Sequence, residues 1–151
     1  MAAEDTLKKL VSAMNRRKAE AVTALYSARC VVYDPFYPEP LKGREAVQKD
    51  AAAFFTAFPD LRIKPGLTVS KGNTFAFEGV MSGTHKGPMP GPTGTIPATN
   101  RRVAARGAIF ARLNAQGQIV EERRHVDAMG FMQQLGLMPP PGGQPTGSPR
   151  R

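Results

Sequence analysis

The sequence predicts an α+β fold, because helical patterns dominate the chain up to Pro59 and strand patterns follow. Short connections at residues 71–73 and 114–117 join two pairs of these strands as antiparallel hairpins. We expect a strongly curved antiparallel sheet wrapped around the longest helix, an arrangement that would enclose a pocket. A length of 151 residues, of which 41% are hydrophobic, is typical of one domain with one core, and we place it at residues 1–138.

Two helices are predicted before the first strand. Apolar residues recur three or four positions apart over residues 7–14, and Asp5 or Thr6 is expected to cap this helix. The pattern resumes at residues 21–26 as a short second helix. The β-branched and aromatic run at residues 30–34 then predicts a strand.

The longest helix is predicted after Gly43, where one apolar stripe continues until Pro59 ends it. Four long strands are predicted next, at residues 61–70, 74–85, 102–113 and 118–127. The remaining segments are a Pro- and Gly-rich loop, a short last helix and a disordered tail, at residues 86–100, 129–137 and 139–151.

The chain carries 21 Lys and Arg against 12 Asp and Glu, a formal net charge of +9, which raises the question of a nucleic-acid partner. The basic residues form scattered pairs without aromatic residues between them, so no nucleic-acid binding is expected. The longest uncharged stretch, residues 128–149, contains five prolines and is not a membrane span. One cysteine, Cys30, and no visible secretion signal predict a cytoplasmic location. Two histidines 40 positions apart show no metal-ligand spacing, so no metal is expected.

Short motifs in a fixed order carry a resemblance to a known family: Tyr33-Asp34-Pro35, Gly43-Arg44-Glu45, Phe58-Pro59-Asp60, Gly83-Thr84-His85-Lys86-Gly87, Arg102-Val103, and Gly117-Gln118-Ile119-Val120-Glu121 leading to Asp127 and Gln134-Leu135-Gly136-Leu137. From about Ala21 to Pro139 the chain resembles the SnoaL-like polyketide cyclase (ester cyclase) family of the nuclear-transport-factor-2-like superfamily. The resemblance implies a cone-shaped α+β barrel whose interior is an active site without a cofactor. It also implies a homodimer formed through the sheet and a hydrophobic small-molecule substrate.

The resemblance assigns the general acid/base of an intramolecular aldol closure to Asp127. In the family's cyclases this carboxylate removes a proton from an activated carbon and can return it after the C–C bond forms. Apolar neighbours such as Val126 and Phe131 would raise the pKa of Asp127 towards neutrality, as a base working near pH 7 requires. The alternative is a solvated Asp127 that caps the following helix. If Asp127 is catalytic, Asp127→Asn abolishes turnover and leaves the fold intact.

His85 is the second catalytic candidate. By strand alternation it shares an apolar face with Phe75 and Phe77, so it can donate to a substrate carbonyl or hold the enolate. Its alternative role is structural, with the imidazole bonded to the backbone of the following loop. Phe77 on the same face is predicted to bind substrate.

Further substrate-binding candidates lie at the ends and the centre of strands. Tyr33 and Asp34 end the first strand near the expected pocket mouth, although an Asp before a Pro often fixes a turn. Arg106 lies between small residues and either reaches inward or pairs with Glu78 or Asp34.

His125 has the same strand parity as Asp127, so it either tunes that carboxyl group or shares a solvated face with it, in which case Asp127 points outward. The run Arg123-Arg124-His125 departs from the family pattern and puts the exact reaction in doubt.

Two functions follow from these observations. The first is a cofactor-independent cyclase or isomerase that acts by enolate chemistry on a polyketide-like or other hydrophobic carbonyl compound. The alternative is a non-catalytic ligand-binding or dimerisation module of the same fold. A buried Asp127 facing a cavity favours the enzyme, and a surface-facing Asp127 or a filled interior favours the module. Epoxide hydrolysis by an Asp-Arg-Asp constellation is disfavoured, because Ala108 stands where a carboxylate would follow Arg106.

Overall fold

One six-stranded sheet forms the centre of the protein, whose computed structural model describes residues 2–91, 93–140 and 142. The strands stand in the order β2-β1-β8-β7-β4-β3. Every pair is antiparallel except β1 and β8, which run parallel. The strand bounds are β1 (Tyr26–Tyr33), β2 (Leu41–Lys42), β3 (Arg62–Lys71), β4 (Thr74–Thr84), β7 (Arg102–Leu113) and β8 (Ile119–Val126).

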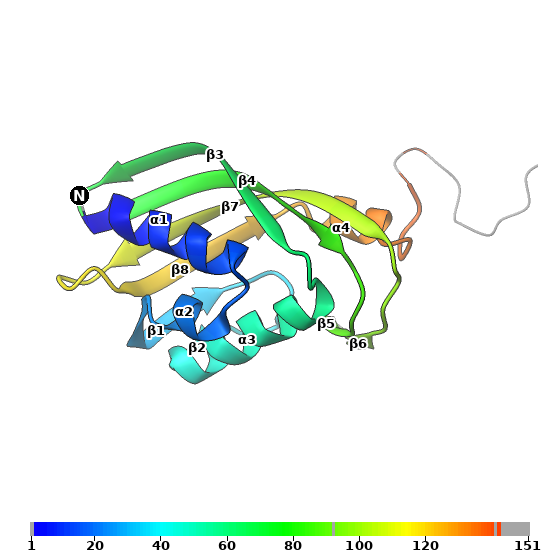
Figure 1. Ribbon diagram of the computed structural model, residues 1–151, viewed down its shortest axis with the longest axis horizontal. Coiled ribbons are helices and arrows are strands. Elements are labelled where there is room, and N and C mark those ends of the chain that lie inside the picture. Colours follow the sequence, from blue (N-terminus) through cyan, green and yellow to red (C-terminus); the bar gives the residue numbers. More distant parts are fainter. Residues whose placement is uncertain (1, 92, 141, 143–151) are drawn as a thin grey trace, which may run out of the picture.

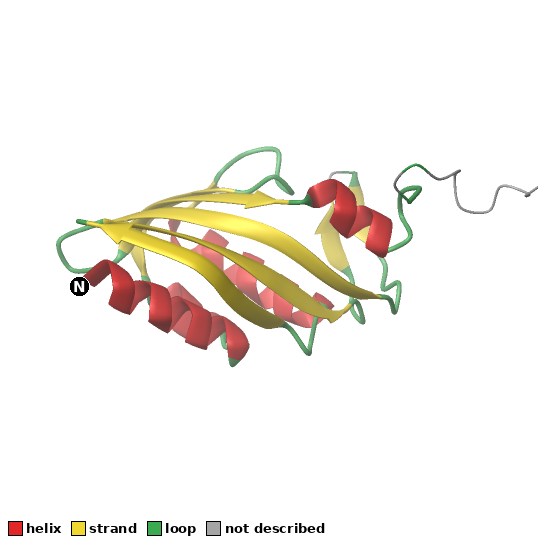
Figure 2. Cartoon of the chain, turned by 90° about the horizontal axis from the view of Figure 1, so that it is seen from above, coloured by secondary structure: helices red, strands yellow, loops and turns green. Residues whose placement is uncertain are grey.

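The sheet is curved; the first three helices lie on its hollow side, and the last lies at one end of the sheet beside β7 (Figures 1 and 2). The helices are α1 (Ala2–Asn15), α2 (Ala19–Thr23), α3 (Gly43–Ala57) and α4 (Ala128–Gln134). α1 packs against β3 and β4, whereas α3 packs against β1 and α2. We call the helix-covered side of the sheet the inner face and the opposite side the outer face. The α+β class and the curved sheet predicted from the sequence are confirmed.

The four long strands lie within two residues of their predicted ends, but the N-terminal predictions are wrong in two places. α1 begins at Ala2, so Thr6 lies inside the helix and does not cap it; its Oγ1 donates to the Gly117 carbonyl at 2.7 Å. Tyr26 begins β1 and does not end α2, because the backbone there already pairs with β8, where the Ile119 amide donates to the Leu25 carbonyl at 2.8 Å.

The loop predicted at residues 86–100 contains a hairpin of β5 (Met89–Gly91) and β6 (Gly94–Ile96). Backbone hydrogen bonds join the two ends of this loop. The His85 amide donates to the Arg101 carbonyl at 2.9 Å, and the Asn100 amide donates to the His85 carbonyl at 2.8 Å. Gly87 lies so close to the Thr56 carbonyl that a Cβ atom there would come within 2.4 Å of it. Most of the predicted tail, residues 141 and 143–151, lies outside the described residues.

Buried apolar residues form two clusters. One cluster includes Leu10 of α1 together with Tyr26 and Phe75 of the sheet, and the other includes Phe58 and, from α4, Phe131. Burial of these large side chains is the main driving force for docking the helices. Within the described residues, no helix has both the length and the apolar character needed to cross a membrane.

Candidate active site

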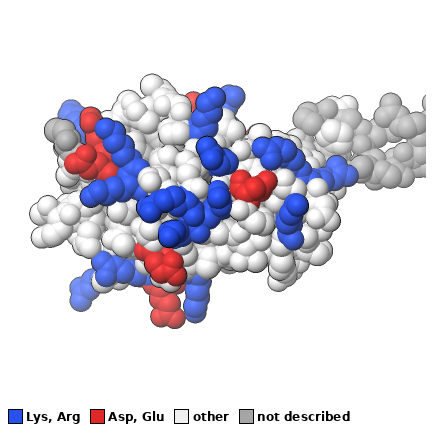
Figure 3. All heavy atoms as spheres, viewed as in Figure 1, with Lys and Arg blue, Asp and Glu red and all other residues white. Residues whose placement is uncertain are grey.

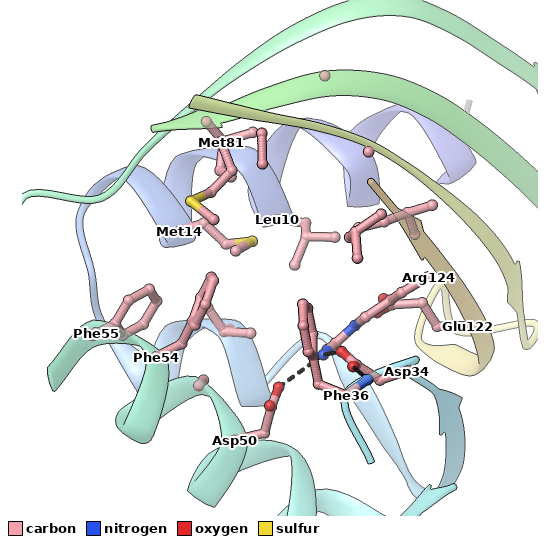
Figure 4. Close-up of a pocket in the computed structure, with 18 of the residues that line it drawn as sticks. Leu10, Met14, Asp34, Phe36, Asp50, Phe54, Phe55, Met81, Glu122 and Arg124 are labelled. Atoms are coloured by element: carbon pink, nitrogen blue, oxygen red, sulfur yellow. Dashed lines mark hydrogen bonds and ion pairs between the residues drawn. The ribbon is translucent and has the colours of Figure 1, made fainter. Parts of the chain in front are cut away.

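A cavity of about 180 Å³ lies between the inner face, α1 and α3 (Figure 4). Gly79 and Gly107 face each other on β4 and β7 and line it, so neither strand fills the space with a side chain there. The rest of the lining is mostly apolar and includes Leu10, Met14, Phe54, Phe55, Phe77, Met81, Ile109 and Phe131. Such a cavity suits a hydrophobic small molecule.

Arg124 and three carboxylates form the polar end of the cavity (Figure 4). The Nε of Arg124 donates to Glu122 Oε2 at 2.6 Å. Its Nη1 donates to Asp34 Oδ2 at 3.0 Å and to Asp50 Oδ2 at 2.8 Å. The exposed fraction of the side chain is 18% for Arg124, 15% for Asp50, 11% for Asp34 and 1% for Glu122. These ion pairs are therefore largely removed from water.

Two phenols complete this network. The hydroxyl of Tyr26 donates to Glu122 Oε1 at 2.5 Å, and that of Tyr37 donates to Asp50 Oδ1 at 2.8 Å. Burial, with Glu122 beside Tyr26 and Asp50 beside Tyr37, raises the pKa of both hydroxyl groups, so they remain neutral donors.

The charge of Arg124 is permanent. Burial by itself would lower the pKa of Arg124, but the neighbouring Glu122, Asp50 and Asp34 outweigh it and raise this pKa well above its usual range. The guanidinium therefore donates hydrogen bonds and does not transfer protons. On the face of the molecule that Figure 3 shows, Lys and Arg side chains are interspersed with acidic ones.

The four ionic residues come from three separate elements. Glu122 and Arg124 are two positions apart on β8 and so share its inner face. Asp50 projects from α3, and Asp34 follows β1. Asp34 Oδ1 also accepts from the Phe36 amide at 2.8 Å, so Asp34 both shapes the turn and reaches the cavity.

The predicted position of Asp127 in the pocket is wrong. Asp127 is exposed, and its carboxylate accepts from the Gly130 amide at 2.9 Å to cap α4, which was the structural alternative. The reason is that Glu122, Arg124 and Val126 occupy the inner face of β8, so Asp127, the residue after Val126, alternates to the other side.

Arg106, His125 and Tyr33 are also absent from the cavity lining, contrary to prediction. All three are exposed. His125 meets Phe110 edge to face, and the Arg123 guanidinium lies 4.5 Å from the centre of the Tyr33 ring. These contacts belong to the outer face.

His85 is fully buried but does not line the cavity. Its ring stacks on Phe58, and its Nδ1 accepts from the Thr99 amide at 3.2 Å, so Nε2 carries the ring proton. Nε2 has no hydrogen-bond partner among the described residues, and burial lowers the pKa of His85. The position fits the structural alternative, an imidazole that ties down the following loop.

Asp34 and Phe77 are the predicted substrate-binding residues that do line the cavity. Sequence reasoning missed Arg124, Glu122 and Asp50. Two sequence patterns could have indicated these residues. Asp50 interrupts the apolar stripe of its helix. Glu122 and Arg124 are two positions apart in a predicted strand and therefore share a face.

The sequence profile of the SnoaL-like polyketide cyclases matches residues 4–135. The chain belongs to this family. The resemblance drawn from the sequence motifs is thereby confirmed. None of the curated proteins matches the chain.

Solved structures share the SnoaL-like fold. A candidate SnoaL-like polyketide cyclase from Jannaschia sp. CCS1 is 18% identical, with a TM-score of 0.78 over 92% of this chain and 94% of that one. IdmH, a candidate polyketide cyclase from Streptomyces antibioticus, is 25% identical, with a TM-score of 0.71 over 89% and 98%. The epoxide hydrolase/cyclase-like enzyme SalBIII is 17% identical, with a TM-score of 0.69 over 85% and 92%.

Proposed function

We propose that this SnoaL-like protein is a cofactor-independent enzyme that closes a ring in a hydrophobic carbonyl compound by an intramolecular aldol reaction. The observation that carries the proposal is an apolar cavity with two carboxylates and a guanidinium at one end. The apolar walls hold a hydrophobic substrate and exclude water from the reacting atoms. The carboxylates supply a base and, once protonated, an acid.

Asp50 is the general base in this proposal, in place of Asp127. It projects from α3 beside Ala51, Ala53 and Phe54, which all line the cavity. Asp50 takes a proton from the carbon next to a carbonyl group, and the electrons of that C–H bond form an enolate. The enolate carbon attacks a second carbonyl of the same molecule, and the proton on Asp50 passes to the alkoxide. The product is an isomer of the substrate, so no co-reactant is needed.

Arg124 stabilises the enolate oxygen. Its Nε and Nη1 are held by Glu122, Asp34 and Asp50, whereas Nη2 makes no hydrogen bond to any described residue. Nη2 therefore remains to donate to a substrate oxygen on which negative charge develops. Asp34, which also holds Nη1, keeps its predicted place among the substrate-binding residues.

The enolisation step can be tested without the natural substrate. We expect the protein to exchange the methylene protons of the hydrophobic ketone 2-tetralone for deuterium in D2O, followed by NMR. Asp50→Asn should slow this exchange by about 10²-fold or more, because Asn retains the shape but accepts no proton. Asp127→Asn is the matched control and should keep the full rate, because Asp127 lies outside the cavity.

Two results contradict the proposal. Exchange no faster than in buffer would favour the non-catalytic ligand-binding module, which the exposed Asp127 also favours. Exchange that survives in Asp50→Asn but fails in Asp127→Asn would return the role of base to Asp127.

Epoxide opening is a second candidate, and a specific observation favours it. The carboxylate-guanidinium-carboxylate arrangement that is missing around Arg106 is present around Arg124, with Glu122 two positions away on the same strand. SalBIII is described as epoxide hydrolase/cyclase-like and acts in pyran ring formation. Here Asp50 would take the proton of a hydroxyl nucleophile that attacks the epoxide carbon, and the proton would then pass to the opened oxygen. Hydrolysis of styrene oxide by the wild-type chain, lost in Asp50→Asn, would support this reaction.

A further inference from the structure

We infer that Tyr26 and Glu122 are positioning residues, which fix the guanidinium of Arg124 so that its Nη2 is presented to the cavity. For its catalytic consequence the inference rests on the proposed function, since it concerns the group assigned to the enolate oxygen. The claim that these two residues fix the guanidinium rests only on the hydrogen bonds around Arg124.

The two hydrogen bonds that link these residues are the shortest side-chain bonds in the described part of the chain. Tyr26 donates to Glu122 Oε1 at 2.5 Å, and Arg124 Nε donates to Glu122 Oε2 at 2.6 Å. Tyr26 and Glu122 are each 1% exposed. The link also joins β1 to β8, where Tyr26 pairs with Ile119 and Glu122 pairs with Val32 on either side of a register shift, so the sheet holds the backbone of both partners in place.

This arrangement fixes the plane of the guanidinium. Tyr26 holds one oxygen of Glu122, which leaves the other oxygen facing Arg124 Nε. Asp34 and Asp50 then hold Nη1, so two of the three guanidinium nitrogens are anchored in a rigid planar group. The third, Nη2, is left without a bond to the described residues, and Arg124 itself lines the cavity.

The hydrogen bonds of Tyr26 and Glu122 are directed to each other and to Arg124. Tyr26 has a single proton, which it gives to Glu122, and each oxygen of Glu122 already holds one donor. They therefore act through Arg124. A purely structural role is a poor account of them, because buried ion pairs are often no more stabilising than apolar residues of the same size.

Glu122 also sets the charge that Asp50 experiences. It offsets the positive charge of Arg124, which contacts Asp50 at 2.8 Å. Without Glu122, Nε of Arg124 loses its partner, and the guanidinium keeps only its contacts through Nη1.

The first experiment compares the rate of 2-tetralone exchange in Glu122→Gln, Tyr26→Phe and the wild type. We expect both variants to be at least tenfold slower. Glu121→Gln is the matched control, because Glu121 is the neighbouring residue and its ion pairs lie with Arg112 and Arg123. A folded Glu122→Gln with the exchange rate of the wild type would overturn the inference.

The second experiment follows the side-chain 15N signals of Arg124 by NMR and needs no activity. In the wild type we expect separate Nη1 and Nη2 signals, because the anchored group rotates slowly. They should merge in Tyr26→Phe, which removes one hydroxyl and little volume. Merged signals in the wild type, or separate ones in Tyr26→Phe, would refute the positioning. Separate wild-type signals together with no exchange of 2-tetralone would refute only the proposed function.

Discussion

The two faces of β8 carry similar residues in opposite environments. Glu121 and Arg123 on the outer face pair at 3.3 Å with side chains that are 31% and 51% exposed. Glu122 and Arg124 on the inner face pair at 2.6 Å with side chains that are 1% and 18% exposed. One strand therefore holds two Glu-Arg pairs of equal sequence spacing, of which one faces water and the other faces the cavity.

The difference teaches that burial decides what such a pair does. A solvent-exposed pair contributes about 0–1 kcal/mol, since water screens it. A pair removed from water loses its hydration, and the fold tolerates it only when each charged group has a partner of opposite charge. The contacts of Arg124 with three carboxylates meet this condition. We therefore place the chemistry on the inner pair, and neighbouring residues of β8 serve as controls for one another.

The largest expected effect comes from Arg124→Gln. It leaves Glu122, Asp34 and Asp50 close together without their counter-ion, so we expect a loss of about 3–5 kcal/mol in the free energy of unfolding. Arg123→Gln should lose no more than about 1 kcal/mol. Urea unfolding at neutral pH measures both. Equal losses in the two variants would mean that the inner pair is as well solvated as the outer one.

A smaller effect on stability is expected from the two histidines, which also differ in burial. His85 is buried, whereas His125 is exposed on the outer face. Because burial lowers the pKa of His85 in the folded state, the unfolded chain binds more protons at mildly acidic pH. Stability is then complete above the unfolded pKa of about 6.5 and falls as the pH drops towards the lower folded value.

Thermal unfolding between pH 7.5 and pH 5 tests this expectation. We expect Tm to decrease between these pH values by the same amount in the wild type and in His125→Gln. The decrease should be smaller in His85→Gln, which lacks the contribution of His85. A decrease that is the same in all three proteins would assign it to other groups.

The smallest expected effect on the site comes from the outer face itself. We propose that this face forms the homodimer implied by the family resemblance, because the large apolar side chains of Phe110 and Tyr33 are 49% and 38% exposed there. Phe110→Glu should convert a dimer to a monomer in light scattering and leave 2-tetralone exchange unchanged, since Phe110 does not line the cavity. A monomeric wild-type protein would refute the dimer.

Local patterns were sufficient for the elements because each depends on neighbours in the sequence. The apolar stripe of α3 and the alternation in β7 are examples, and the predicted and observed bounds of β7 coincide. Predictions failed where a distant partner decided the outcome. Tyr26 has a helical neighbourhood in the sequence but joins the sheet, because β8 offers backbone partners and a carboxylate for its hydroxyl.

The sequence by itself determined the α+β class, the family and the fact that alternate residues of β8 share a face. It did not determine which face is buried, because residues 121–125 are charged or polar on both faces and hydrophobicity cannot separate them. Only the tertiary structure decided that Glu122 and Arg124 turn inward, and only there do Asp34 and Asp50 meet Arg124, across 90 and 74 positions of the chain. The physical reason is that strand pairing and helix docking set these long-range distances, while periodicity describes one element at a time.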